Sequence, residues 1–215
     1  MKVAVITPHY KPKSDWFRKC VESVEEQEYK CTHIIVCDGS DIPSKSILEK
    51  KHIQLVTFQI RHNDAGDTPR AVGSISAFNQ GFDAIAYLDD DNWYKANHIK
   101  NLVNCFESYN SPICASSRLI YDLDSNFMGD CYETHPDKFI DTNCYFITKY
   151  ARKMVNIWWQ MSKQQHKIDD RIFLRAIKEN NIDFHFSNEK TVCYRTSYIQ
   201  HYKYFNLPVP ENFKS

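Results

Sequence analysis

Glycine is scarce in this chain. Only 5 of the 215 residues are glycine, and the segment Thr7-Pro8-His9-Tyr10-Lys11-Pro12, which follows the first predicted strand, contains none. A glycine-rich loop lets the backbone approach a phosphate group closely, so this segment argues against a phosphate-binding loop of that kind. The chain is 42% hydrophobic, which is not the composition of a disordered protein.

Long apolar runs, an excess of one charge and closely spaced cysteine pairs are missing too. No apolar run approaches the roughly 20 residues of a membrane helix, and the segment 1–6 lacks the features of a signal peptide. Lys plus Arg and Asp plus Glu both number 27, so no global charge attracts nucleic acid or anionic lipid. None of the eight cysteines forms a Cys-x-x-Cys pair, which argues against a zinc site. We therefore expect a cytoplasmic protein with free thiols, no transmembrane segment and no nucleic-acid partner.

Apolar runs and helical periodicities alternate in the first half of the chain. Strands are predicted at residues 3–7, 32–37, 55–60, 84–88 and 113–117, and helices from a Ser14 cap onward and at residues 44–51, 70–80 and 92–108. Strands separated by helices predict a mostly parallel sheet with right-handed crossovers. The second half predicts β segments near residues 118–121, 143–148 and 191–195, and helices near 149–161 and 169–180. We expect one α/β domain over residues 1–215, with a sheet lobe at 1–117 and a smaller mixed lobe at 118–215.

Three consecutive aspartates, Asp89, Asp90 and Asp91, directly follow the predicted strand at 84–88. Their charges repel one another, and the hard cations Mg²⁺ and Mn²⁺ prefer carboxylate oxygens, often together with substrate phosphates. Open α/β sheets bind ligands outside the carboxyl ends of their strands. The triplet therefore indicates a metal–diphosphate site, with a solvated acidic turn that caps the next helix as the alternative.

Polar segments follow two further predicted strands, and a polar loop precedes a predicted helix. These segments are Thr7-Pro8-His9-Tyr10, Asp38-Gly39-Ser40 and the loop from Asn63 to Arg70. The carboxyl ends of parallel strands lie at one edge of a sheet, so we expect these segments to meet the aspartate triplet in space.

Four segments together resemble the inverting glycosyltransferases of family 2, which have the GT-A fold. They are Val5-Ile6-Thr7-Pro8-His9-Tyr10, Ile34-Ile35-Val36-Cys37-Asp38-Gly39-Ser40, Tyr87-Leu88-Asp89-Asp90-Asp91 as the Asp-x-Asp motif, and Ile168-Asp169-Asp170-Arg171-Ile172-Phe173 as the acidic motif. The resemblance is good over residues 1–110, patchier up to 180 and loose beyond. It implies metal-dependent transfer of a sugar, with Mn²⁺ or Mg²⁺, from a nucleotide-sugar to a hydroxyl of a saccharide or other acceptor. A UDP-linked donor is favoured.

The resemblance also assigns roles to residues of the donor site. Asp91 would ligate the metal, Asp89 would reach the metal or the ribose, and Asp90 would be secondary. Asp38 could accept the N3–H of a uracil ring, because a carboxylate is a pure acceptor; an Asp-Gly turn is the alternative.

The other donor-site assignments concern the first motif and the polar loop. Thr7 and Pro8 would shape the nucleotide pocket together with His9 and Tyr10, although Thr-Pro also simply ends a strand. Asp67 and Arg70 would lie beside the donor, where Arg70 could contact a phosphate. A surface ion pair between these two residues is equally compatible with the sequence.

The acidic motif would supply the catalytic base. Asp170 would take the proton of the acceptor hydroxyl, and Asp169 precedes it where the family often has Glu. Both could also be acids at a helix start, where they favour the helix dipole.

Two later features allow weaker assignments. His201 is a candidate third metal ligand on position alone, with a surface histidine as the alternative. Trp158 and Trp159 could form a sugar-stacking platform or belong to a core. The aromatic tail at residues 198–205 could contact a membrane or a lipid-linked acceptor, at the inner face of a membrane, or pack onto the second lobe.

Two other functions compete with sugar transfer. A sugar nucleotidyltransferase has a related sheet but needs the glycine-rich loop that is absent here. A catalytically silent protein that binds a carbohydrate or a nucleotide on the same fold is the alternative from another class.

Overall fold

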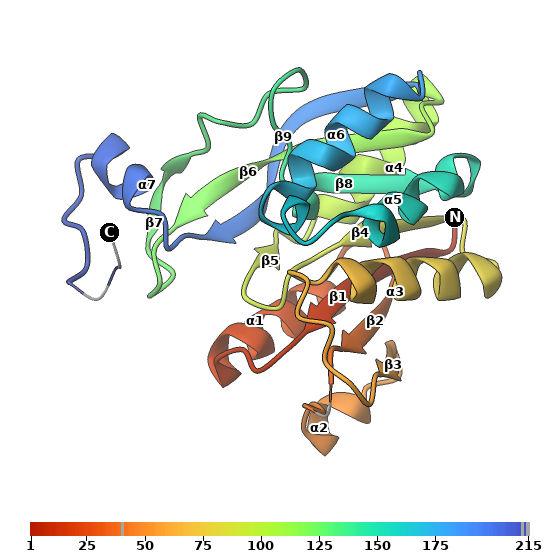
Figure 1. Ribbon diagram of the computed structural model, residues 1–215, viewed down its shortest axis with the longest axis horizontal. Helices are drawn as coiled ribbons and strands as arrows, with labels where there is room; N and C mark the ends of the chain where they lie inside the picture. The colour runs from red at the N-terminus through yellow and green to blue at the C-terminus, as the bar shows by residue number, and fades with distance from the viewer. Residues whose placement is uncertain (40, 212, 214–215) are drawn as a thin grey trace.

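A mixed β-sheet runs through the computed structural model, which describes residues 1–39, 41–211 and 213 (Figure 1). Among these residues the strand order is β3-β2-β1-β4-β8-β6-β9-β5, and β7 pairs with β6 outside this path. The strands are β1 (Val3–His9), β2 (Thr32–Cys37), β3 (Ile53–Thr57), β4 (Ala84–Tyr87), β5 (Trp93–Tyr94), β6 (Ile113–Tyr121), β7 (Phe127–Asp130), β8 (Tyr145–Thr148) and β9 (Phe184–Arg195). Ser40, part of the second polar motif, lies outside the described residues.

Helices and short 3₁₀ turns connect these strands. The α-helices are α1 (Ser14–Glu25), α2 (Lys45–Leu48), α3 (Asp67–Asn79), α4 (His98–Tyr109), α5 (Ile157–Gln160), α6 (Asp169–Glu179) and α7 (Ile199–Tyr204), and the 3₁₀ segments are η1 (Thr142–Cys144), η2 (Lys149–Asn156) and η3 (Gln165–Ile168). In the part of the chain that is described, no helix combines the length and the apolar character that crossing a membrane requires.

The predicted parallel pairing is confirmed for four of the five strands of the first half, whereas β6 is separated from β4 by the antiparallel strand β8. Strands β3, β2, β1 and β4 pair in parallel, and β1 and β2 are almost entirely buried, as expected for strands covered on both faces. Helix α3 packs closely on this half. A Cβ at Gly73 would lie 2.5 Å from Cγ2 of Ile6 and 2.9 Å from Cγ2 of Val36, so only glycine allows this approach. The close packing fixes the N-terminal end of α3 next to the carboxyl ends of β1 and β2.

The second half of the sheet is mixed. Strand β8 lies between β4 and β6 and is antiparallel to both, while β6 and β9 form a long parallel pair. The predicted boundary at 117/118 falls inside β6, so one sheet joins the two predicted lobes. Because β8 runs opposite to β4, the amino end of β8 lies beside the carboxyl end of β4. This topology brings residues 141–143 next to the aspartate triplet.

Several element boundaries differ from the sequence prediction. Trp93 and Tyr94 form β5 against Cys193 and Val192 of β9, so the helix predicted from residue 92 begins only at His98. Aromatic side chains favour strands, which the helical periodicity of the following residues concealed. Ser14 is the first residue of α1 and not its cap, which is Lys13.

The two adjacent tryptophans have different surroundings, and the core interpretation is confirmed for Trp158. Trp158 is 1% exposed and stacks on Phe173 with a centroid distance of 4.6 Å, whereas Trp159 is 49% exposed. Trp158 Nε1 also donates a hydrogen bond to the hydroxyl of Tyr87, at 2.9 Å. Trp158 therefore joins the start of α6 to the central strand β4.

The C-terminal aromatic residues pack on the second half of the sheet. Helix α7 lies beside β7 at the end of the molecule away from β2 and β3 (Figure 1). Tyr202 is buried, and Tyr204 stacks on Tyr132 with a centroid distance of 3.8 Å. A side chain at Gly129 of β7 would collide with the ring of Phe205. Packing onto the second half, one of the two interpretations of this tail, agrees with these contacts.

Candidate active site

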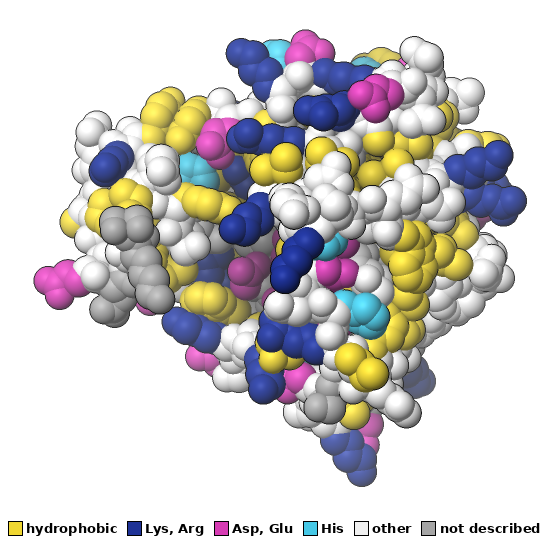
Figure 2. Space-filling view, viewed as in Figure 1, with side chains coloured by type: hydrophobic (Ala, Val, Ile, Leu, Met, Phe, Trp, Pro, Cys, Tyr) yellow, Lys and Arg dark blue, Asp and Glu magenta, His cyan; other side chains and the backbone are white. Residues whose placement is uncertain are grey.

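A cavity of about 310 Å³ lies at the carboxyl ends of β1, β2 and β4 and the N-terminal end of α3. Figure 2 shows a hollow on this face of the molecule, with acidic side chains visible in it and Lys and Arg side chains around it. We call this cavity the donor-side cavity. The residues proposed for nucleotide or metal binding that line it are Pro8, His9, Tyr10, Asp38, Arg70, Asp89, Asp90 and Asp91.

Thr7 and Asp67 do not line this cavity, so a direct role of their side chains in binding a nucleotide is wrong. Both side chains are fully buried. Oγ1 of Thr7 lies 2.7 Å from Nε2 of His33, inside the sheet. The Asp67 carboxylate lies behind Arg70, and its Oδ2 is 2.6 Å from Nδ1 of His166. These side chains therefore support the walls of the cavity from inside.

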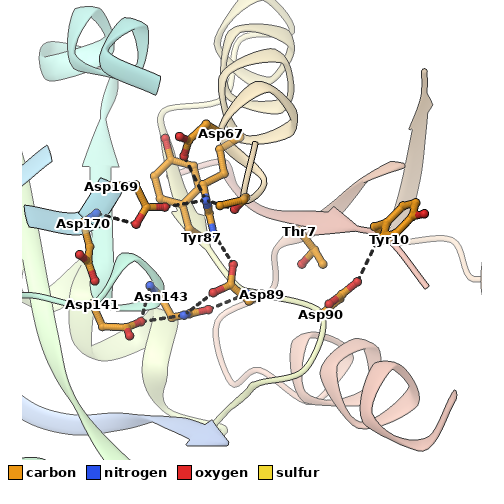
Figure 3. A network of polar contacts seen from close by, with 12 residues as sticks. Thr7, Tyr10, Asp67, Tyr87, Asp89, Asp90, Asp141, Asn143, Asp169 and Asp170 are labelled. Carbon is orange, nitrogen blue, oxygen red and sulfur yellow. Dashed lines mark hydrogen bonds and ion pairs between the residues drawn. The ribbon is translucent and has the colours of Figure 1, made fainter. Parts of the chain in front are cut away.

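Asp89 and Asp90 of the triplet have different partners (Figure 3). Asp89 accepts hydrogen bonds from Nη2 of Arg70 at 2.6 Å and from Nδ2 of Asn143 at 2.9 Å. Asp90 turns to the end of β1, where it accepts a bond from the Tyr10 backbone N–H at 3.0 Å and lies 3.4 Å from Nδ1 of His9.

Asp91 is the unpaired acid of the triplet. Within the described residues, no hydrogen bond or ion pair engages its side-chain oxygens; its backbone carbonyl accepts a bond from Nη1 of Arg195. Burial and the neighbouring Asp89 and Asp90 raise the pKa of Asp91 to about 7. Its carboxylate is therefore the one with oxygens available for a ligand.

Arg70 connects the triplet to the acidic motif of α6. Its guanidinium is 3.2 Å from Oδ2 of Asp169 and 3.4 Å from Oδ1 of Asp67, in addition to the bond to Asp89. Burial lowers the pKa of Arg70, but the three carboxylates outweigh burial and raise it. Arg70 is only 4% exposed, so the alternative of a surface ion pair is wrong.

Asp38 anchors the loop that follows β3. Its Oδ1 accepts a bond from the His62 backbone N–H at 2.8 Å and is 3.0 Å from Nδ1 of His62, and its Oδ2 accepts a bond from the Asn63 N–H at 3.1 Å. Gly39 directly after it has φ +106°, a left-handed conformation that favours glycine. The Asp-Gly turn thus places a nearly buried carboxylate in the wall of the donor-side cavity.

A second cavity of about 620 Å³, the base-side cavity, adjoins the first and contains Asp169 and Asp170. Arg70 and Asp89 line both cavities and form their border. A third cavity of about 350 Å³, the outer cavity, also reaches Asp170. Asp170 therefore faces open space on two sides.

The two acids at the start of α6 have different surroundings. Asp169 is bound by Arg70 and accepts a hydrogen bond from the Asp170 N–H at 2.8 Å. The Asp170 carboxylate accepts a bond from the Arg171 N–H at 2.8 Å. Burial, Asp141 and Asp169 raise the pKa of Asp170 to about 7, so it exchanges a proton near neutral pH.

His201 does not join the aspartate triplet. It is 2% exposed, its Nδ1 lies 2.6 Å from Oγ1 of Thr196, and its Nε2 lies 2.9 Å from Oε2 of Glu133. It lines the outer cavity, whereas Asp91 lines the donor-side cavity. Both ring nitrogens of His201 are engaged and its side chain is buried. His201 is therefore neither a metal ligand at the triplet nor a surface histidine.

Sequence reasoning missed Asp141 and Asn143. Asn143 binds Asp89 twice, because its Oδ1 accepts the Asp89 N–H at 2.5 Å and its Nδ2 donates to the Asp89 carboxylate. The same Nδ2 lies 2.7 Å from Oδ1 of Asp141. The available signal was the polar run 141–143 directly before the apolar strand β8, but the prediction considered only the carboxyl ends of strands.

The donor set fits a metal ion that is bound together with a diphosphate. Among the described residues, no group of three or more His, Cys, Asp or Glu side chains is arranged to hold an ion alone. Mg²⁺ in phosphate-transfer sites is typically held by one or two carboxylates together with substrate phosphates and water. Asp91 supplies one unpaired carboxylate at the donor-side cavity, which meets this requirement.

Comparison with known proteins shows which family this sequence belongs to. Residues 4–164 match the family model described as glycosyl transferase family 2. The chain belongs to this family. The resemblance is therefore confirmed over the first three motifs, and the acidic motif at residues 168–173 follows shortly after the matched segment.

Solved structures show that this chain has the predicted GT-A fold. The crystal structure of residues 1–349 of S. aureus TarS superimposes with a TM-score of 0.68 at 13% identity, covering 95% of this chain and 63% of that chain. Its complex with UDP superimposes with a TM-score of 0.67 at 13% identity, covering 95% of this chain and 63% of that chain. Its complex with UDP-GlcNAc superimposes with a TM-score of 0.66 at 13% identity, covering 94% of this chain and 61% of that chain. At this identity the likeness concerns the fold alone, and this chain spans less than two thirds of the length of these chains. No curated protein matches its sequence.

Proposed function

We propose that this glycosyltransferase transfers a sugar from a UDP-linked donor to a hydroxyl of a saccharide or other acceptor, with a divalent metal and with inversion at the anomeric carbon. One observation carries the proposal. The cavity with the unpaired acid Asp91 and the cavity with Asp170 meet at Arg70 and Asp89. A sugar at this border would lie between a diphosphate on one side and a base on the other.

Asp38 supports a uracil base on the donor side. An ionised carboxylate offers about four acceptor positions, and the loop after β3 uses three of them. The remaining position could accept the N3–H of uracil. The complexes of the TarS structures with UDP and UDP-GlcNAc support the same nucleotide.

The triplet and Arg70 would hold the diphosphate end. Asp91 would ligate Mn²⁺ or Mg²⁺, and Asp89, fixed by Arg70 and Asn143, would face the ribose or the ion. When bound, the metal would supply positive charge that stabilises the leaving diphosphate. Arg70 lines the donor-side cavity, so its positive charge would face a phosphate group bound there.

Asp170 would act as the general base. An acceptor hydroxyl in the base-side cavity would lose its proton to Asp170 as its oxygen attacks the anomeric carbon. A base is most effective when its pKa lies near the operating pH, and burial raises the pKa of Asp170 to about 7. One base and one displacement would invert the configuration at the sugar.

UDP and Mn²⁺ are expected to bind cooperatively, because the diphosphate completes the ligand shell around an ion that Asp91 alone holds weakly. Calorimetry should give a tighter UDP dissociation constant with Mn²⁺ than with chelator. Uridine, which lacks the diphosphate, is the matched control and should be insensitive to Mn²⁺. A ligand at 100 times its dissociation constant stabilises the native state by about 2.7 kcal/mol, so thermal shift with UDP, GDP and TDP ranks the bases. Equal UDP affinity after complete chelation contradicts the metal bridge.

A catalytically silent binding protein is the alternative that this site must be tested against. Such a protein would bind UDP and Mn²⁺ in the same way but would not cleave the donor. Release of UDP from a UDP-sugar in the presence of Mn²⁺ distinguishes the two, because water can replace the acceptor at the base.

A further inference from the structure

Asp141 is a buried acid that belongs to none of the four motifs. It is the residue before η1 and is 5% exposed. Its carboxylate is fixed by three donors: Nη1 of Arg118, the Asn143 backbone N–H at 2.9 Å and Nδ2 of Asn143 at 2.7 Å. A carboxylate that accepts hydrogen bonds from a guanidinium and from two amide donors is held in one orientation.

Asp141 faces the proposed base. Both Asp141 and Asp170 line the base-side cavity and the outer cavity, although they come from different elements. Figure 3 shows the Asp170 side chain pointing from the start of α6 toward Asp141. The positive charge of Arg118 is shared, because Nη2 of Arg118 also binds Oε2 of Glu133 at 2.9 Å. Asp170 therefore faces the ion-paired carboxylate of Asp141 across the cavity.

Other charged and titratable groups surround Asp170 from each neighbouring element. They are Asp169 and Arg171 on α6, Lys167 on η3, Arg118 on β6, Tyr145 on β8 and Tyr194 on β9. Glu133, Tyr198 and His201 line the more distant part of the outer cavity. Asp169 already forms an ion pair with Arg70, and Lys167 and Arg171 are exposed to water, which screens their charges. Asp141 is thus the buried acid that faces Asp170 from outside α6.

We propose that Asp141 is a positioning residue for the glycosyltransferase reaction, whose fixed carboxylate faces Asp170 and strengthens it as a proton acceptor. This inference rests on the proposed function, because it takes Asp170 as the base. A like charge nearby disfavours ionisation, so the neighbour binds its proton more tightly. After burial, Asp141 is the largest cause of the raised pKa of Asp170. The bonds from Asn143 to both Asp141 and Asp89 fix the base side relative to the donor side.

Asp141→Asn is expected to weaken proton binding by Asp170 about tenfold, which lowers the pKa of its carboxyl. A ¹³C NMR titration of the Asp170 carboxyl carbon, assigned with Asp170→Asn, measures this directly and needs no catalytic turnover. The pH profile of UDP release from a UDP-sugar should move its acidic limb by the same amount, with a lower plateau because the base is weaker. Asp137→Asn, the same change at a 76% exposed side chain, is the matched control and should shift neither curve.

Asp141→Asn leaves Arg118 buried with fewer partners, and the variant protein could fail to fold for that reason. A double variant keeps the test decisive in that case. Asp141→Asn/Arg118→Gln removes both charges together. Because Arg118 lowers the pKa of Asp170, the double variant should shift the titration downward, but by less than the single change. An Asp170 titration unchanged in every folded variant overturns the inference. Absence of UDP release in the parent protein would instead contradict the proposed function, while the NMR titration would still report on Asp141.

Discussion

Asp170→Asn is expected to lose sugar transfer and to keep donor and metal binding. The amide has the same size and its oxygen can still accept the Arg171 N–H bond, so α6 should begin as before. It cannot take a proton, and removal of a general base typically lowers the rate about 10²- to 10⁴-fold. UDP release from a UDP-sugar measures the rate, and calorimetry with UDP and Mn²⁺ measures binding.

The same variant should be more stable than the parent at neutral pH. Folding raises the pKa of Asp170 from 3.8 to about 7, mainly because burial disfavours the charged form. Between these values the native state holds a proton that the unfolded state has lost, so the contribution of Asp170 to stability falls as pH rises from about 4 to about 7. A tenfold difference in proton affinity between the folded and unfolded states corresponds to about 1.4 kcal/mol. We expect a gain of roughly 1–3 kcal/mol at pH 7 by urea denaturation and little change at pH 4.

Asp137→Asn serves as the surface control for both measurements, because its side chain is 76% exposed and lies in none of the three cavities. A loss confined to donor affinity in Asp170→Asn would contradict the base role. That outcome would assign Asp170 to the donor site and make Asp169 the next residue to test.

Asp91→Asn is expected to abolish metal-dependent donor binding while the fold survives. Asp91 supplies the unpaired carboxylate of the triplet, and an amide oxygen is a much weaker ligand for a hard cation. Its removal takes away one of three crowded like charges, so stability should stay unchanged or rise. Calorimetry of UDP with and without Mn²⁺ tests binding, and thermal denaturation tests the fold.

Asp90→Asn is the matched control for Asp91→Asn. Asp90 carries the same charge one position earlier, but its carboxylate is directed to the end of β1 by Tyr10 and His9. We expect this variant to retain the Mn²⁺ dependence of UDP binding. Turnover of Asp91→Asn at the parent rate with the same Mn²⁺ dependence would show that Asp91 does not ligate the metal.

The convergence of the polar segments on one cavity could be predicted from the sequence, because parallel strands obey a simple rule. Their carboxyl ends meet at one edge, so the segments after β1, β2 and β4 had to converge there. The partners of each side chain did not follow from the sequence. Whether Asp67 faces the cavity depends on the orientation of α3 and on the guanidinium of Arg70, which binds Asp67, Asp89 and Asp169.

The residues around the base-side cavity were harder to predict from the sequence, because the chain reverses direction there. Asp141 and Asn143 precede β8, which is antiparallel to β4. Their place near Asp89 therefore depends on the pairing of β4 with β8, which no local sequence pattern predicts. The same long-range pairing explains β5, since Trp93 finds its partner Cys193 about a hundred residues later. Position alone likewise misassigned His201, whose partners Thr196 and Glu133 occupy both of its nitrogens.

The configuration of the first sugar released from a UDP-α-sugar tests the central claim most directly. Water can replace the acceptor hydroxyl at Asp170, so the measurement needs no knowledge of the natural acceptor. Proton NMR recorded during hydrolysis with Mn²⁺, before the free sugar equilibrates between its anomers, identifies the anomer that forms first. A single displacement assisted by Asp170 predicts the β anomer, whereas first release of the α anomer would contradict an inverting transferase with one base.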